Sequence, residues 1–308
     1  MTIRRAMPLV AFLVAAGSPF AVAQERGTLE PAPLPPLANP ADPKTPAKEL
    51  FGRKAAPLPL AARSIGFYTR GCLAGAIALP VNGKTWQVMR LSRNRNWGHP
   101  ALITFLERFA ARAPKAGWPG ILVGDLAQPR GGPMLTGHAS HQVGLDADIW
   151  LTPMPKRELT RQEREEMSAV NVVRTDKRDI DPAAWTPHHV AVIRAAASDP
   201  EVERVLVNAA IKKALCRDAG TDRAWLRKVR PWWGHNYHMH IRIGCPADSP
   251  ECKPQDPAPE GEGCGKELDY WFRDSILNPP PPLFPPKPKP PITMAELPPA
   301  CRTVALSP

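Results

Sequence analysis

The chain has 308 residues, 40 proline residues and a formal net charge of +11 at pH 7. A basic chain is attracted to polyanions, such as those of a cell envelope. Its basic residues are scattered and no nucleic-acid-binding motif is present, which argues against a nucleic-acid-binding protein.

The first 23 residues are predicted to be a secretory signal peptide. Arg4 and Arg5 give a positive start, residues 7–16 are apolar, and residues 21–23 (Ala-Val-Ala) are typical of a cleavage site. The apolar run is too short to cross a bilayer comfortably, so an uncleaved anchor is the less favoured alternative. Without Arg4 and Arg5 the charge falls to +9. We expect an exported mature protein with no transmembrane segment.

Proline-rich segments flank the central part of the chain. Residues 24–63 have the composition of an extended linker, and residues 276–308 form a tail that begins with four consecutive prolines at 279–282. Residues 64–275 are long enough to bury one substantial core, so they are predicted to form a single domain.

In chain order, this central part is predicted to contain a strand (85–91), a helix ended by Pro114 (101–113), two strands (120–126 and 145–151), three helices (160–170, 187–197 and 201–215) and a last strand (237–243). The helix at 160–170 begins with a capping box formed by Thr160 and Glu163. Helices and strands do not alternate regularly. The predicted fold class is therefore α+β, with a mainly antiparallel central sheet flanked by helices.

The six cysteines of the chain are predicted to form up to three structural disulfides. They are Cys72, Cys216, Cys245, Cys252, Cys264 and Cys301, and none belongs to a Cys-x-x-Cys pair. In an exported chain this spacing argues against a zinc ribbon and leaves fifteen possible pairings. Cys245 and Cys252 are close enough to clip one loop, and a bond from Cys301 would tie the tail to the body.

Five of the eight histidines fall in two short segments, and the first segment also carries two aspartates. These residues are His138, His141, Asp146 and Asp148 in the first segment and His235, His238 and His240 in the second. Residues two apart on a strand point to the same face. Two adjacent strands would therefore bring His141, Asp148 and His240 around one ion, with His238 beside it.

Such a cluster indicates a zinc hydrolase. Three nitrogen or oxygen ligands leave a tetrahedral zinc with one open position for water, whose pKa the metal lowers towards neutrality. His238 is then placed to act as general base. Ser140 lies next to His141 but lacks the Ser-x-x-Lys or Gly-x-Ser-x-Gly context of a nucleophile, so we interpret it as structural.

The two segments resemble the signature of the lysostaphin, D-alanyl-D-alanine peptidase and hedgehog superfamily, His141-x6-Asp148 followed by His238-x-His240. Longer motifs are more similar to penicillin-insensitive murein endopeptidases. These motifs are His138-Ala-Ser-His-Gln-x-Gly-Leu-Asp-x-Asp-Ile, the run from Leu226-Arg-Lys-Val-Arg-Pro-Trp to His238-Met-His-x-Arg, and the segments around Asn208, Cys216 and Cys245. The resemblance extends from about residue 65 to residue 301.

The resemblance implies a periplasmic zinc endopeptidase that hydrolyses D-alanyl–meso-diaminopimelyl cross-bridges in peptidoglycan and is insensitive to penicillin. It implies that His141, Asp148 and His240 bind one zinc tightly. It also implies that His238 is the general base and that His235 stabilises an oxyanion.

The resemblance further implies that His138 contributes to a second, weaker metal site. The matching partners are Asp176 and Asp179, where an aspartate stands in place of the expected histidine, and a charged loop is the alternative. The implied disulfides are Cys72–Cys301, Cys216–Cys264 and Cys245–Cys252.

Two other functions fit the sequence. One is a D,D-carboxypeptidase or dipeptidase on the same scaffold, and the other is a catalytically idle, zinc-containing cell-wall-binding module, which would not need His238. A zinc store would require a histidine-rich tract, which the sequence lacks. Candidates for contacts to substrate are Arg227, Lys228, Arg230, Arg242, Trp232 and Trp233, with a solvated face or core packing as the alternatives.

Overall fold

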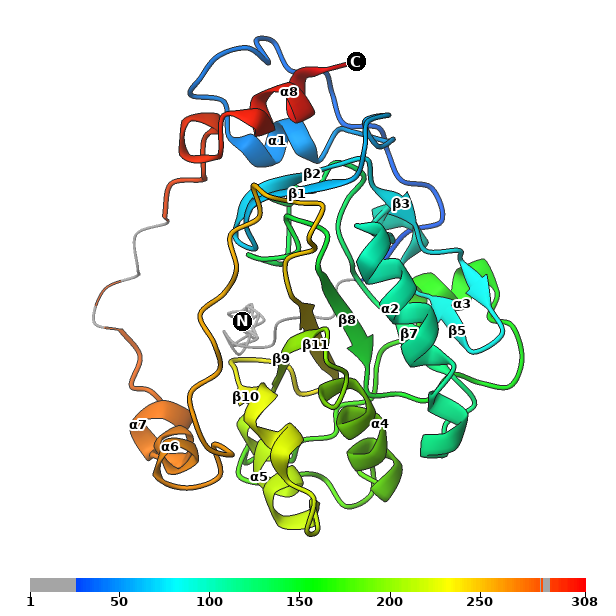
Figure 1. Cartoon of the computed structure of the whole chain (residues 1–308), viewed down its shortest axis with the longest axis vertical. Helices are drawn as coiled ribbons and strands as arrows, with labels where there is room; N and C mark the ends of the chain where they lie inside the picture. The colour runs from blue at the N-terminus through cyan, green and yellow to red at the C-terminus, as the bar shows by residue number, and fades with distance from the viewer. Residues whose placement is uncertain (1–25, 283, 285–288) are drawn as a thin grey trace, which may run out of the picture.

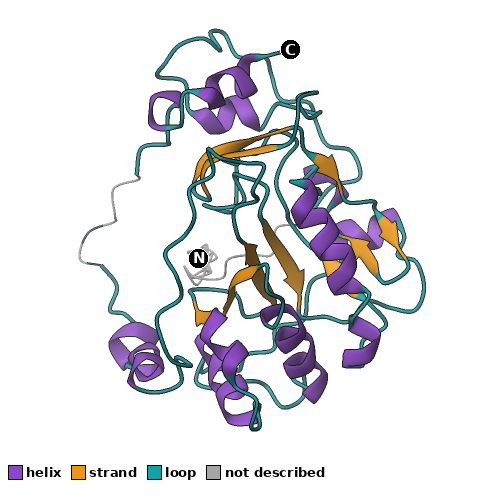
Figure 2. Cartoon of the chain, in the orientation of Figure 1, coloured by secondary structure: helices purple, strands orange, loops and turns teal. Residues whose placement is uncertain are grey.

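The computed structural model describes residues 26–282, 284 and 289–308, so the predicted signal peptide lies outside the described residues. A seven-stranded sheet occupies the centre, with helices around it (Figures 1 and 2). This arrangement confirms the predicted α+β class. No helix in the described ranges combines the length and hydrophobicity needed to cross a bilayer.

The strand order of the central sheet is β10-β9-β11-β8-β7-β5-β4. Its strands are β4 (Asn82–Gly83), β5 (Trp86–Val88), β7 (Ile121–Val123), β8 (Asp146–Trp150), β9 (Val202–Val207), β10 (Val229–Pro231) and β11 (His238–Ile243). The β10–β9 and β5–β7 pairs are parallel and the others are antiparallel. Two small antiparallel sheets are β1 (Arg63–Phe67) with β2 (Arg70–Ala74) and β3 (Ile77–Ala78) with β6 (Trp97–Gly98).

One face of the sheet is apolar and packs against helices. Ala147 and Ile149 of β8 and Met239 and Ile241 of β11 are fully buried in the main core. The same core contains apolar residues of α2 (Pro100–Ala110), α4 (Pro187–Ala197) and α5 (Ala209–Asp218). Because side chains alternate along a strand, the intervening polar residues of β8 and β11 point to the opposite face, away from these helices.

Local sequence sets where these helices begin. The side chain of His99 accepts a hydrogen bond from the N–H of Ala101, and Pro100 occupies the first position of α2. The side chain of Asn208 accepts one from Ala210 at the start of α5. Such caps satisfy backbone groups that have no partner inside the helix.

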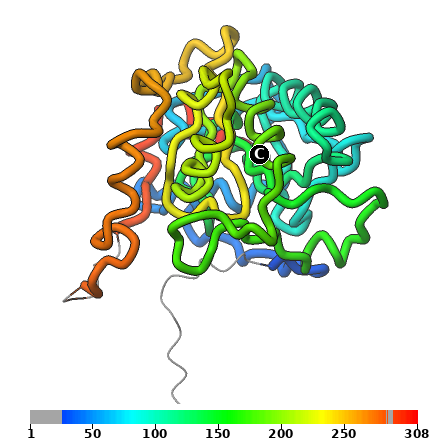
Figure 3. The backbone as a smooth tube through the Cα atoms, turned by 90° about the horizontal axis from the view of Figure 1, so that it is seen from below, coloured from blue at the N-terminus to red at the C-terminus, as the bar shows by residue number. Residues whose placement is uncertain are grey.

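The two ends of the chain meet in a second, smaller core. Helices α1 (Ala47–Phe51) and α8 (Ala300–Leu306) pack together beside β1 and β2 (Figure 1). The predicted linker and tail therefore each carry a helix. Viewed from below, the segment that contains α6 (Lys266–Asp269) and α7 (Asp274–Leu277), coloured orange, runs along one side of the body (Figure 3).

The remaining helical elements are short. They are α3 (Arg161–Glu166), α6 (Lys266–Asp269), α7 (Asp274–Leu277) and the 3-10 turns η1 (Leu91–Arg93), η2 (Ala113–Ala116), η3 (Ala224–Lys228), η4 (Tyr270–Phe272) and η5 (Met294–Glu296). Helix α3 has the predicted capping box of Thr160 and Glu163. The four predicted strands and the helix at 187–197 are confirmed with small changes at their ends.

The helix predicted over residues 201–215 is wrong in its first half. Val202–Val207 forms β9 between β10 and β11, and α5 begins only after Asn208. The run Val-Glu-Arg-Val-Leu-Val has β-branched residues whose stiff side chains suit a strand. The helix predicted over 101–113 ends at Ala110, and Pro114 lies in η2 instead of marking the end.

The structure contains the three disulfides that the resemblance implies: Cys72–Cys301, Cys216–Cys264 and Cys245–Cys252. The first joins residues 229 apart in sequence and fastens α8 to β2.

Replacing Cys72 and Cys301 by serine is expected to lower the free energy of unfolding by about 2–5 kcal/mol. Urea-induced unfolding measures this loss. The matched control is the Cys245→Ser/Cys252→Ser pair, which spans only 7 residues. Chain entropy predicts that this control loses about 3 kcal/mol less, since short loops restrict the unfolded chain less. Equal losses for the two pairs would contradict the expectation.

Candidate metal centre

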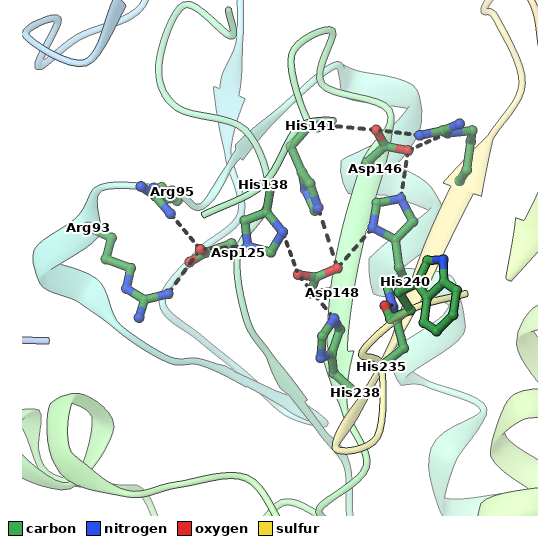
Figure 4. Close-up of polar contacts among 12 residues, drawn as sticks. Arg93, Arg95, Asp125, His138, His141, Asp146, Asp148, His235, His238 and His240 are labelled. Carbon is green, nitrogen blue, oxygen red and sulfur yellow. Dashed lines mark hydrogen bonds and ion pairs between the residues drawn. The ribbon is translucent and has the colours of Figure 1, made fainter. Parts of the chain in front are cut away.

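The polar face of β8 and β11 carries two of the predicted ligands, Asp148 and His240. The two strands are antiparallel neighbours, with Asp148 directly opposite His240 and Asp146 directly opposite Arg242. The Nδ1 atom of His240 lies 3.0 Å from Oδ1 of Asp148. The register therefore brings the two segments together as the sequence predicted (Figure 4).

Four histidines surround the Asp148 carboxylate. Nδ1 of His240 and Nε2 of His141 lie 3.0 and 3.4 Å from Oδ1. Nδ1 of His138 and Nε2 of His238 lie 3.4 and 3.6 Å from Oδ2. Burial alone would raise the pKa of Asp148, but the facing histidines hold it well below its usual range. The carboxylate is thus an anion with donor nitrogens on both sides.

His141 stands at the end of a strained loop. Its φ is +66°, in the left-handed region that residues other than glycine rarely adopt. Gly144, at φ +71°, completes the turn into β8, where a Cβ would lie 2.4 Å from Cδ2 of Leu73. The backbone N–H of His141 donates to Oδ2 of Asp146 at 3.0 Å, which holds the loop against the strand.

The ring of His141 is fully buried, yet neither of its nitrogens has a hydrogen-bond partner among the described residues. Such burial is costly unless another group satisfies these atoms. Ligand atoms of His138, His141 and Asp148 all lie within 4.8 Å of one another, close enough to hold a metal ion. Nitrogen and carboxylate donors are those that zinc accepts. The residues present therefore fit a zinc ion.

His240 faces the same carboxylate from the other side, so two donor sets overlap at Asp148. Its Nε2 lies 3.1 Å from Oδ1 of Asp146. A proton on Nε2, shared with Asp146, leaves the lone pair of Nδ1 free to bind a metal ion beside Asp148. Carboxylates outside the ligand shell orient metal-binding histidines in this way. Burial lowers the pKa of His240, but Asp146 and Asp148 outweigh it and raise the pKa to about 9. Metal binding at Nδ1 must therefore displace a proton.

Asp146 connects three parts of the centre. Besides His240 and the backbone of His141, it accepts hydrogen bonds from Nε and Nη2 of Arg242 at 2.7 and 3.2 Å. It is fully buried, and Arg242 is the first of the groups that hold its pKa low against the effect of burial. Asp146 thus fixes both the ring of His240 and the loop of His141.

Asp146→Asn is expected to weaken zinc affinity about 10- to 100-fold, because an amide cannot accept all of these hydrogen bonds. Competition with a chromophoric chelator measures the affinity. Asp222→Asn is the control, since Asp222 is an exposed residue paired with Arg194. Unchanged affinity in the Asp146 variant would show that the carboxylate does not position the ligands.

The second histidine segment places two further rings beside the ligands. The ring of His238 is mostly buried, and its Nδ1 has no partner among the described residues. Burial lowers the pKa of His238 to about 4. A neutral ring with an unprotonated nitrogen is the form that accepts a proton.

His235 adopts a left-handed backbone, with φ +54°, and its ring lies 4.7 Å from that of His238. Its Nδ1 donates to the carbonyl of Trp233 at 2.7 Å. A neutral His235 therefore presents an unprotonated Nε2, which accepts hydrogen bonds. Stabilising an oxyanion would require the charged ring, although burial lowers the pKa of His235 to about 3.

Comparison with known proteins places this centre in a family. Residues 64–306 match the family model of the penicillin-insensitive murein endopeptidases. The chain belongs to this family. It is 47% identical to the penicillin-insensitive murein endopeptidase of Haemophilus influenzae over 252 residues, which cover 80% of this chain and 84% of that protein. It is 46% identical to that of Yersinia enterocolitica over 235 residues, which cover 76% and 85%.

Two of the predicted ligands of this murein endopeptidase family member, Asp176 and Asp179, do not join the group of residues at the centre. Asp176 pairs with Arg174 and accepts the N–H of Arg178, whereas Asp179 pairs with Lys213 and Arg217. Within the described residues, the group of potential metal ligands includes His138 but neither of these aspartates. A second metal would have to displace these ion pairs, so the second site stays a prediction.

The candidate basic residues are engaged inside the protein. Arg227 donates to Ala258, Lys228 to Asp199, Arg230 pairs with Glu267 and Arg242 pairs with Asp146. Because these four residues already have partners within the protein, the structure does not favour a role for them in binding substrate carboxylates. Trp232 and Trp233 are exposed, so they are not core residues.

The buried carboxylate of Asp125 belongs to the centre but was not among the residues predicted from sequence. Its Oδ2 lies 3.1 Å from Nε2 of His138, and Arg93 and Arg95 pair with the same oxygen at 3.0 and 2.8 Å (Figure 4). Asp125 orients His138 from the side away from Asp148. One signal was available, since Asp125 is a charged residue that directly follows the apolar run Ile-Leu-Val-Gly, two residues beyond the end of the buried strand β7.

Proposed function

We propose that this chain is a periplasmic, zinc-dependent murein endopeptidase that hydrolyses D-alanyl–meso-diaminopimelyl cross-bridges of peptidoglycan. The observation that carries the proposal is the fully buried His141, whose ring has no hydrogen-bond partner among the described residues and whose Nε2 lies 3.4 Å from the Asp148 carboxylate. A metal ion bound at Nε2 would satisfy this nitrogen, and family membership supports the substrate class.

In this proposal His141, Asp148 and His240 hold the zinc, with His138 beside Asp148 as the alternative third donor. A bound zinc supplies a Lewis acid that polarises a carbonyl and lowers the pKa of a water molecule. The Asp146 carboxylate keeps the ring of His240 turned towards the ion. Asp125 does the same for His138.

His238 is the proposed general base. Its Nε2 faces the Asp148 carboxylate at 3.6 Å, beyond hydrogen-bonding distance, and is able to take a proton from the attacking water. The ring then returns this proton to the amine that leaves the cleaved amide. His235 accepts a hydrogen bond from substrate or water through Nε2 in its neutral form. The oxyanion role implied by the resemblance would need a proton on this atom.

Export to an oxidising compartment is supported by three disulfides in the structure. Their number accounts for all six cysteines of the chain. Residues 1–23 are the proposed signal peptide for this export.

The test uses purified mature protein and defined cross-linked muropeptide dimers, with the products read by mass spectrometry in the presence and absence of penicillin. Conversion of dimer to monomer at an unchanged rate with penicillin is the expected result. Loss of terminal D-alanine from intact dimers would instead assign a D,D-carboxypeptidase. A zinc-loaded protein that binds cell wall without turnover would assign an idle binding module.

A further inference from the structure

An exposed aromatic platform, formed by Trp233, Tyr270 and Trp271, lies beside the candidate metal centre, and the exposed Trp232 precedes Trp233 in the chain. The exposed fractions of Trp232, Trp233 and Tyr270 are 53%, 55% and 44%. Ring centroids of Trp233 and Trp271 are 5.0 Å apart, and those of Tyr270 and Trp271 are 6.0 Å apart. Exposed apolar side chains that gather in this way mark binding surfaces more often than singly scattered ones do.

Two segments distant in sequence build the platform. Trp233 follows β10, whereas Tyr270 and Trp271 belong to η4, beyond the Cys216–Cys264 disulfide. In the described part of the chain, the indole N–H groups of these two tryptophans have no hydrogen-bond partner. The platform thus offers aromatic faces and N–H donors to a ligand at the same time, which is the amphipathic character typical of aromatic binding residues.

The platform is continuous with the candidate catalytic residues. The carbonyl of Trp233 accepts the hydrogen bond from Nδ1 of His235 at 2.7 Å. The ring of His235 lies 4.7 Å from that of His238 and 6.0 Å from that of His240. The backbone at Trp233 therefore connects the platform directly to the histidine rings of the candidate metal centre.

The chemistry of the platform fits a sugar chain better than a peptide stem. Flat aromatic rings pack against the C–H faces of sugar rings, and indole N–H groups donate to hydroxyl or amide oxygens. A stem peptide carries carboxylates, which favour cations. Both cations at this surface already have partners: Arg273 lies over the ring of the platform residue Tyr270 at 5.4 Å, and Lys213 lies over Phe272 at 5.3 Å and pairs with Asp179.

We propose that the platform of Trp233, Tyr270 and Trp271 binds the glycan strand from which the cleaved cross-bridge extends. This inference rests on the proposed function, since the glycan is the other component of a peptidoglycan substrate. The platform then holds the enzyme on the polymer while the metal centre acts on the peptide.

The test compares two substrates with the full mature protein and its Trp271→Ala and Tyr270→Ala variants. These residues lie on a different segment from the site histidines. One substrate is the cross-linked peptide dimer freed of sugars, and the other is intact sacculi. We expect unchanged rates on the sugar-free dimer and rates about 2- to 10-fold lower on sacculi. The control is Phe284→Ala, an exposed ring outside the platform, with 81% exposure.

A direct binding assay uses peptide-free glycan strands, which wild type should retain and Trp271→Ala should release. Equal loss on both substrates would assign the platform to the peptide, and no loss on either would remove its role. Either result overturns the proposal. A wild type that binds glycan strands but cleaves no dimer would refute the proposed function while leaving the glycan site standing.

Discussion

Asp148→Asn is expected to remove zinc from the protein and to lower the rate of cross-bridge cleavage by about 10³-fold or more. Among the described residues, Asp148 is the one carboxylate that faces His138, His141, His238 and His240 together. An asparagine keeps the shape but loses the negative charge that a divalent ion requires. Since metal catalysis supplies several kcal/mol, its loss corresponds to a decrease of this size.

Two readouts are needed for this variant: bound zinc by atomic absorption and cleavage of muropeptide dimers. Asp248→Asn is the matched control, because Asp248 is 63% exposed and contacts His99 rather than the centre. Folding is followed by circular dichroism, as loss of the charge also changes the surroundings of four histidines. A variant that folds, holds no zinc and cleaves at the normal rate would contradict the metal assignment.

His238→Ala is expected to retain zinc while losing about 10²- to 10⁴-fold in rate, the range typical of a lost general base. His238 stands opposite Trp150 in the β11–β8 register, and its Nε2 is 3.6 Å from Oδ2 of Asp148. Its Nε2 is therefore close to the centre but beyond hydrogen-bonding distance of the carboxylate, which leaves this nitrogen for proton transfer.

Zinc content separates this expectation from a ligand role. His188→Ala is the control, since His188 is exposed and its Nδ1 contacts the carbonyl of Ala116. Loss of zinc together with activity in His238→Ala would make His238 a ligand. Full activity would remove it from the chemistry.

The pairing of β8 with β11 was predictable from sequence because strand periodicity is simple. Asp146 and Asp148 fall two apart, as do His238 and His240, and a metal requires them on one face. The structure adds the register, in which Asp148 is opposite His240. The α+β class was also predictable, because the predicted helices and strands do not alternate regularly along the chain.

Other features depend on contacts between distant segments. Residues 202–207 form a central strand because β10 and β11 flank them. The helical periodicity of the local sequence carries no information about these distant neighbours. The contact of Asp125 with His138 requires the fold, since 13 residues separate them. Trp271 reaches Trp233 through the path of the C-terminal segment, which no motif predicts.

Stoichiometric reconstitution tests most directly whether one zinc ion at Asp148 is needed for the proposed cleavage. Protein stripped by a chelator is titrated with zinc, and its rate on cross-linked muropeptide dimers is recorded at each step. The proposal predicts negligible activity without metal and a linear return that levels off at about one zinc per chain. Full activity in protein shown to be free of metal would contradict it.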